Sequence, residues 1–176
     1  MTEVLFVDGY NIVNDWAELV SMQRVSLASA REQLIDTLMD YQGFTGKHVI
    51  LVFDAHMVKN AVEKSEFHGA VEVVYTRADE TADNCIERRI FEWMRRDEDA
   101  RIRVATSDQT EQHMILGLGA ARMSARELKN EVERVRAERD RMIRERRAPK
   151  PNTLEGRLAG DTLDKLERLR RQGGET

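Results

Sequence analysis

Cysteine is nearly absent from this chain of 176 residues, in which Cys85 is the one thiol. A single cysteine excludes an internal disulfide and fits a reducing compartment, which we expect to be the cytoplasm. The chain also lacks any apolar run near the ~20 residues that a membrane span requires, so we expect no membrane partner. No basic segment precedes the apolar residues near the N-terminus. We therefore interpret this region as a first strand and not as a signal peptide.

Two kinds of catalytic site also find no support in the sequence. The histidines lack the spacing of zinc ligands: His48, His56, His68 and His113. No Ser/His or Cys/His arrangement suggests a covalent nucleophile. Cys85 falls on the apolar stripe of a predicted helix, which indicates a core position.

Charge is unevenly distributed along the chain. Residues 122–176 contain 16 Lys and Arg against 11 Asp and Glu, a net charge of +5. Residues 1–121 contain 12 against 21, a net charge of −9. An acidic body with a basic tail can mark an appendage that contacts nucleic acid. A salt-bridged, solvated helix would give the same asymmetry.

The hydrophobic pattern predicts an α/β domain with a central parallel sheet. Four short runs rich in β-branched residues do not alternate, as in strands that are buried on both faces. They are Val4–Val7, Val49–Phe53, Val71–Tyr75 and Ile102–Ala105. Helical spacing separates them, in the segments that start near Leu27 and Ala82, and a further helix is expected over Asp108–Leu118. Strand alternating with helix implies right-handed crossovers and three layers.

A charged helical extension is predicted to follow this domain. Ser124 and Glu127 have the spacing of a capping box, and the helix should run to about Arg147. Its residues Glu131 and Arg134 are spaced to pair across one turn. We therefore divide the chain into a domain over residues 1–125 and an extension over residues 126–176.

Acidic residues follow each of the four predicted strands. They are Asp8, Asp54, Asp79, Glu80, Asp83 and Asp108. The carboxyl ends of parallel strands meet at one edge of the sheet, and ligand sites in open α/β sheets lie there, where the strand order switches. Acids that are far apart in the sequence are thus expected to converge. Each acid, taken singly, could instead be an N-cap or a turn residue.

Converging carboxylates repel one another and raise each other's pKa values, and a divalent cation removes that cost. Magnesium and manganese are hard ions that prefer oxygen ligands. At ~100° per residue, Asp83 falls at the edge of the apolar stripe that Ala82 and Ile86 share. That position turns Asp83 toward the sheet edge, as a metal ligand requires.

A series of segments resembles the YacP-like branch of NYN domains, which belong to the PIN-like nuclease superfamily. The resemblance covers roughly residues 3–125, and its motifs follow one another in the expected order at the strand ends. The segments are Phe6–Ile12 (FVDGYNI), Val52–Ala55, Val71–Thr76, Asp79–Asp83 with Ile86–Glu87, and Thr106–Gln109.

The resemblance implies a PIN-like endoribonuclease that depends on Mg²⁺ or Mn²⁺ and takes part in mRNA decay. Members of this branch act in at least one case on the translating ribosome. By resemblance Asp8, Asp83 and Asp108 are the principal catalytic, metal-binding acids. Asn11 would orient Asp8 or contact a substrate phosphate. The remaining candidates are additional acids at Asp79, Glu80 and Asp54, and a polar support at Ser107.

RNA is the expected partner, and the ribosome is a further candidate. An acidic centre does not attract RNA, so the counterion-release contribution would come from the basic helix. Its candidate contacts are Arg134, Arg136, Arg139, Arg141, Arg144, Arg146 and Arg147. Tyr10 is open to two interpretations, stacking on a base or packing in the core.

Three other functions fit the sequence less well. A phosphatase of the haloacid dehalogenase type needs a second aspartate two residues after the first, where this chain has Tyr10. A receiver-like domain needs an acid pair after the first strand and a lysine after the last, and neither is present. A non-catalytic factor that binds RNA or the ribosome on a PIN-like scaffold would be expected to lose acids at the strand ends, and they are all retained.

Overall fold

The structure, a computed structural model, describes residues 2–55, 62–107 and 119–147. Their strands form one sheet with the order β3-β4-β2-β1-β5-β6. Neighbouring strands are parallel except for β3 and β4, so the predicted central parallel sheet is confirmed apart from one antiparallel edge strand. The strands are β1 Glu3–Asp8, β2 His48–Phe53, β3 Lys64–His68, β4 Val71–Tyr75, β5 Arg101–Ala105 and β6 Ala121–Met123.

The four strands predicted from buried apolar runs are confirmed as β1, β2, β4 and β5. The two edge strands, β3 and β6, were not predicted. β3 has the sequence KSEFH and is mostly exposed or half-buried, and β6 has only three residues. An edge strand has a neighbouring strand on one side only, and its other edge faces solvent, so polar side chains are common in it. Such a strand lacks the continuous apolar run from which the buried strands were predicted.

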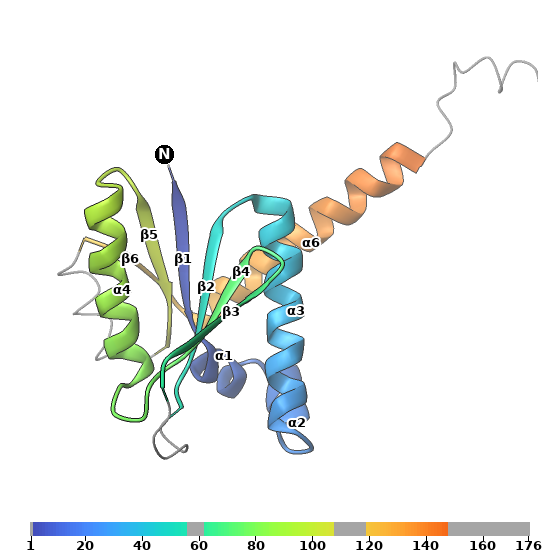
Figure 1. Cartoon of the computed structure of the whole chain (residues 1–176). Helices are drawn as coiled ribbons and strands as arrows, with labels where there is room; N and C mark the ends of the chain where they lie inside the picture. The colour runs from blue at the N-terminus through green and yellow to red at the C-terminus, as the bar shows by residue number, and fades with distance from the viewer. Residues whose placement is uncertain (1, 56–61, 108–118, 148–176) are drawn as a thin grey trace, which may run out of the picture. The chain divides into compact units, whose positions relative to one another are not determined.

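Helices cover both faces of the sheet, which confirms the three-layer α/β architecture (Figure 1). On one face lie α1, α2, α3 and the beginning of α6, and their core includes Leu34, Leu38 and Leu128. On the other face lies α4, which buries Cys85, Ile86 and Ile90. The helices are α1 Gly9–Asp15, α2 Ala17–Gln23, α3 Leu27–Thr45, α4 Ala82–Arg96 and α6 Ala125–Arg147. The helix expected over residues 108–118 lies outside the described residues.

The predicted capping box begins α6. The Glu127 backbone N–H donates to Ser124 Oγ at 3.2 Å, and the Ser124 backbone N–H donates to Glu127 Oε2 at 2.7 Å. The predicted pairing within this helix, however, differs from the observed one. Glu131 binds Arg103 of β5 and Lys47 before β2, at 2.8 Å and 2.9 Å, in place of Arg134.

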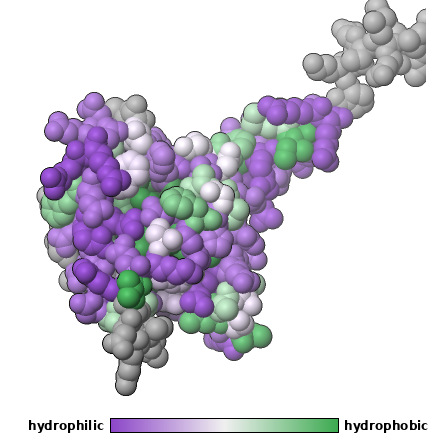
Figure 2. Space-filling view, in the orientation of Figure 1, coloured by the Kyte–Doolittle hydropathy of each residue, from purple (hydrophilic) through white to green (hydrophobic). Residues whose placement is uncertain are grey.

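The chain consists of two compact units, residues 1–137 and 138–176. In the second unit the described residues 138–147 are exposed except for Arg139 and Asp140, which are half-buried. None of the helices in the described part of the chain has the length and apolar character to cross a bilayer. Figure 2 shows a face on which hydrophilic residues predominate and hydrophobic ones are scattered, in keeping with a charged-residue content of 34%.

The strand order places a switch point beside β1. From β1 the chain continues to β2 and β4 on one side, and then crosses to β5 on the other side. Crevices at the carboxyl ends of the strands, next to such a reversal, are where open α/β sheets bind ligands. The residues that directly follow β1 and β5 are therefore the first place to look for a functional site.

Candidate functional site at the carboxyl edge of the sheet

Asp8 ends β1, between β2 and β5, and is half-buried. Its Oδ1 accepts a hydrogen bond from the backbone N–H of Asn11 at 3.2 Å, so the side chain also caps α1. Burial, and to a smaller extent the charges of Asp83 and Asp54, raise the pKa of Asp8 to about 6 against the lowering effect of the Asn11 N–H. The surroundings of Asp8 therefore destabilise its ionised form relative to the protonated acid.

The structure brings Asp54 and Asp83 to Asp8. Asp54 follows the last residue of β2, which pairs with β1, and it is half-buried. Asp83 lies in the first turn of α4, after the Thr81 cap, and it is also half-buried. The negative charges of both residues act on the Asp8 carboxyl group. Three carboxylates from three segments therefore lie near enough at the predicted edge for their charges to interact.

Asn11 connects Asp8 to the end of β5. Asn11 Oδ1 accepts a hydrogen bond from the backbone N–H of Ser107 at 2.7 Å, while Ser107 Oγ accepts one from the backbone N–H of Ala125 at 3.3 Å. These two bonds span the switch point between β1 and β5 and reach the start of α6. They fix the backbone from which Asp108 departs. Asp108 itself lies outside the described residues.

Asp79 and Glu80 have other surroundings. The Asp79 side chain is 85% exposed and has Arg77 at 3.7 Å. Glu80 is buried, with 7% of its side chain exposed, and both of its oxygens contact Arg88, at 3.0 Å and 3.1 Å. Arg77 approaches Glu80 at 3.4 Å. A metal ion at Glu80 would therefore have to displace a guanidinium group.

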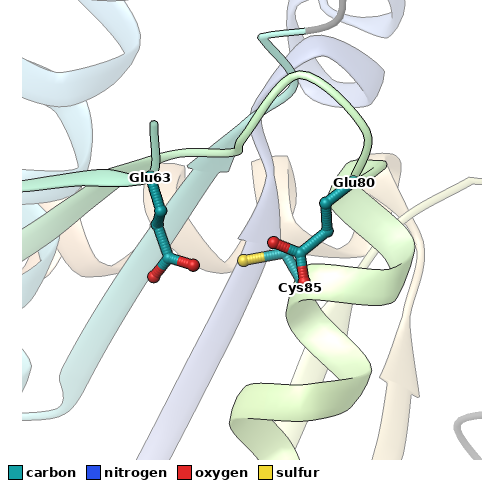
Figure 3. Close-up of side chains that lie close together, drawn as sticks. All are labelled: Glu63, Glu80 and Cys85. Carbon is teal, nitrogen blue, oxygen red and sulfur yellow. The ribbon is translucent and has the colours of Figure 1, made fainter. Parts of the chain in front are cut away.

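One cluster outside the Asp8 site has the composition of a metal site. Ligand atoms of Glu63, Glu80 and Cys85 lie within 4.8 Å of one another and point toward a common centre (Figure 3). Arg88 already supplies the cation there, since its Nη2 contacts Glu63 Oε2, Glu80 Oε2 at 3.1 Å and Cys85 Sγ at 3.7 Å. Burial raises the pKa of the Cys85 thiol to about 11, which keeps it protonated and a poor ligand or nucleophile. The cluster is an ion-pair network that ties α4 to the segment before β3.

Several arginines proposed for RNA contact are exposed on α6. Arg134 and Arg136 lie in the first compact unit. In the second unit, Arg139 contacts Asp140 at 3.3 Å, and Arg141 lies 3.7 Å from Glu145. The remaining members are exposed: Arg144, Arg146 and Arg147.

The donor set around Asp8 fits a hard divalent cation. Carboxylate oxygens are the ligands that Mg²⁺ and Mn²⁺ prefer. The backbone N–H of Asn11 occupies only one of the roughly four lone-pair sites of the Asp8 carboxylate. Burial first, and repulsion by Asp83 and Asp54 second, raise the pKa of Asp8, and a bound cation would offset both costs of the ionised form. Chemically, the arrangement can bind a cation and, through it, an oxyanion such as a phosphodiester.

Comparisons with known proteins point to one group. The sequence model of the family described as YacP-like NYN domain matches residues 5–171. YacP of Bacillus subtilis strain 168 is 41% identical over 171 residues, which cover 96% of this chain and 97% of that protein. The crystal structure of Rae1 (YacP) from Bacillus subtilis is 40% identical, with a TM-score of 0.68 over 96% of this chain and 94% of the other. A crystal structure of a tryptophan-to-leucine mutant of the same Rae1 aligns with a TM-score of 0.71 over 82% of this chain and 83% of the other.

Proposed function

The chain belongs to the YacP-like NYN domain family, within the PIN-like nucleases, and we propose that it is a divalent-metal-dependent endoribonuclease that hydrolyses phosphodiester bonds of mRNA. The observation that carries the proposal is the half-buried Asp8 at the switch point, on which the charges of Asp54 and Asp83 act and whose pKa is raised. Half-buried carboxylates that repel one another lower the stability of a scaffold, whereas a cation-dependent nuclease uses them to hold its metal ion.

The candidate residues have separate roles in this proposal. Asp8, Asp83 and Asp108 would hold Mg²⁺ or Mn²⁺, and Asp54 would add negative charge beside them. The ion would supply Lewis acidity for the phosphoryl oxygens, for a water nucleophile and for the leaving oxygen. Asn11 positions the site: its backbone orients Asp8, and its side chain holds the strand end that leads to Asp108.

Asp8 also sets the protonation state that the site needs. With a pKa of about 6, the carboxyl group is mostly ionised near neutral pH, and burial keeps bulk water from screening its charge. A bound cation stabilises the ionised form further. At a metal concentration below saturation, activity is therefore expected to fall as the pH drops through about 6, because protonation of Asp8 competes with binding of the cation.

RNA contact outside the centre is assigned to the extension over residues 126–176, with the domain over residues 1–125 as the nuclease. Exposed arginines on α6 supply positive charge that the acidic domain lacks. We propose the translating ribosome as the setting and the cytoplasm as the compartment. The ribosome is proposed from the likeness to the YacP group and from the basic character of the extension, and the cytoplasm from the single cysteine.

Cleavage of an mRNA during its translation in a reconstituted system with Mn²⁺ or Mg²⁺ tests the function. Wild type is expected to cut the message and Asp8→Asn to leave it intact. Asp36→Asn is the matched control, because Asp36 is an exposed aspartate on α3. A parallel titration with Mn²⁺ should show weaker binding to Asp8→Asn alone. If neither wild type nor variant cuts while both bind RNA or ribosomes, the protein is a binding factor and not a nuclease.

A further inference from the structure

Three aromatic rings form a layer at the carboxyl edge, on the face that α3 covers. Phe53 and Tyr75 are register partners at the ends of β2 and β4, with ring centroids 5.8 Å apart and planes at 22°. Tyr10 of α1 packs on Phe53 with centroids 5.1 Å apart at 58°. Phe53 is fully buried, whereas Tyr10 and Tyr75 keep part of their surfaces in solvent. The outer two rings therefore offer aromatic surface next to the carboxylate site.

Arg31 extends this layer with a positive charge. It lies near the beginning of α3, is half-buried, and donates from Nη1 to the Tyr10 hydroxyl at 3.3 Å. Its charge also acts on Tyr75, whose pKa burial raises. Within residues 2–55, 62–107 and 119–147, no carboxylate lies within ion-pair distance of Arg31. By contrast, Arg88 and Arg103 each bind glutamates.

A half-buried arginine without an acid in the described part of the chain is unusual, because removing its charge from water has a cost that a carboxylate normally offsets. A guanidinium carries five N–H donors, and the Tyr10 hydroxyl takes one of them. The remaining donors suit a planar oxyanion, and phosphate is matched especially well by the guanidinium fork.

The layer is contiguous with the carboxylates along the chain. Tyr10 stands two residues after Asp8, and Phe53 directly precedes Asp54. The carboxylates gather where α4 begins, whereas the rings and Arg31 lie on the α3 side of the same edge. A strand of RNA that passes over this edge would meet both groups in succession.

We propose that Tyr10, Tyr75 and Arg31 form a subsite for one nucleotide of single-stranded RNA beside the nucleotide that is cut. This inference rests on the ribonuclease function proposed above and deepens it. The base stacks on the exposed tyrosine surface, and the phosphate is held by Arg31. Stacking on an aromatic side chain tolerates every base, so the subsite positions RNA and does not read its sequence.

Equilibrium binding of a fluorescent single-stranded oligoribonucleotide to the full chain tests the subsite. The Asp8→Asn protein serves as the parent, so that no cleavage occurs during the titration. Tyr75→Leu is expected to weaken binding about 5- to 100-fold, the range for loss of one stacked base. Arg31→Gln should weaken binding and lower the slope of log affinity against log salt by about one phosphate contact.

Matched controls separate the subsite from general effects. Phe91→Leu removes a half-exposed ring on α4, and Arg101→Gln removes an exposed arginine at the opposite end of β5. Both should bind like the parent. An oligonucleotide with one abasic position gives an internal check against misfolding. The abasic position should weaken binding to the parent, yet make no further difference to Tyr75→Leu.

The outcomes distinguish this subsite from the proposed nuclease. Unchanged affinity in Tyr75→Leu and Arg31→Gln, or equal sensitivity of Tyr75→Leu and parent to the abasic position, overturns the subsite, even if wild type cuts mRNA. A parent that does not bind the oligonucleotide overturns it as well. Loss of binding in both variants supports the subsite, even if the nuclease assay is negative.

Discussion

At Asp8, burial and the charges of two neighbouring carboxylates act in the same direction. Both favour the protonated acid, so the folded protein holds a proton that the unfolded chain releases near pH 4. The contribution of this bound proton to the free energy of unfolding is complete below pH 4 and is lost as the pH rises through about 6. Above pH 6, without a metal ion, Asp8 therefore lowers the free energy of unfolding.

Asp8→Asn should accordingly stabilise the metal-free protein at pH 8. The rise of the pKa from 3.8 to about 6 corresponds to about 3 kcal/mol as an upper bound. The asparagine Oδ1 still accepts the cap bond from Asn11, so the helix start is preserved. Urea unfolding at pH 4 and pH 8 measures the effect, which should be small at the lower pH. A less stable variant at pH 8 would mean that Asp8 is a structural residue.

Gly9 is required by close packing. An added Cβ would lie 2.4 Å from the ring of Phe53, which is fully buried and cannot move aside. Gly9→Ala should lower the free energy of unfolding by about 1–3 kcal/mol through overpacking. Gly43→Ala is the paired control, since a Cβ there meets nothing within 4 Å, and it should stabilise α3 by about 0.5–1 kcal/mol. Thermal unfolding of the two variants should shift in opposite directions, and shifts of the same sign would contradict this account.

At the scale of elements, one carboxylate fastens α6 to the sheet. Glu131 accepts hydrogen bonds from Arg103 at 2.8 Å and 3.0 Å and from Lys47 at 2.9 Å, and the Tyr41 hydroxyl also donates to it. The Arg103 guanidinium is the largest of the influences that hold the pKa of Glu131 well below its usual range. The hydrophobic residues around it, such as Val132, complete the attachment.

Glu131→Gln should lower the free energy of unfolding by about 2 kcal/mol at neutral pH, because two partly buried cations lose their charged acceptor. A depressed carboxyl pKa gives stability that is present above the unfolded value near 4.5 and lost as the pH falls below it. Wild type should thus lose stability between pH 4.5 and pH 2 more steeply than the variant. The exposed Glu133→Gln is the control. Parallel pH profiles for wild type and Glu131→Gln would refute the assignment.

A second network joins α4 to the segment before β3 through Arg88. Glu80 is bound there by both oxygens, so we expect it to serve the network and not the Asp8 centre. Glu80→Gln should therefore lower thermal stability and leave the affinity for Mn²⁺ unchanged. The alternative, a metal ligand at Glu80, would show the reverse: weaker Mn²⁺ binding in a variant of normal stability. Arg88→Met gives an independent check and should be destabilising, since it leaves Glu63 and Glu80 facing each other.

For the whole molecule, charge is separated between an acidic domain and a basic extension. Neutralising Arg144, Arg146 and Arg147 together by glutamine should weaken binding of RNA or ribosomes and flatten its salt dependence by up to about three phosphate contacts. The free energy of unfolding of residues 1–137 should not change, because the three side chains are exposed. Salt titrations of wild type and the triple variant measure the slope. Identical slopes of log affinity against log salt would mean that these arginines are solvent-exposed charges that do not contact RNA.

Much of the fold was determined by the sequence alone. Buried strands were found because a parallel strand covered on both faces must be apolar throughout, and the capping box because Ser124 and Glu127 satisfy each other locally. The placement of Asp8 and Asp54 at one edge, near enough for their charges to interact, followed from topology, since parallel strands deliver their carboxyl ends to one edge. These features depend on periodicity, on local hydrogen bonds or on strand direction, all of which are visible in one dimension.

Only the tertiary structure decided which charged groups are partners. Glu131 could pair with Arg134 by spacing, but the packing of α6 on the sheet brings Arg103 and Lys47 closer to it. Glu80 is a candidate metal ligand by its position in the sequence, but the fold places Arg88 of α4 at both of its oxygens. Arg31 gave no signal in the sequence because its neighbours come from α1 and β4. Partner choice depends on distances between segments that are remote in the chain, and only the packed layers fix those distances.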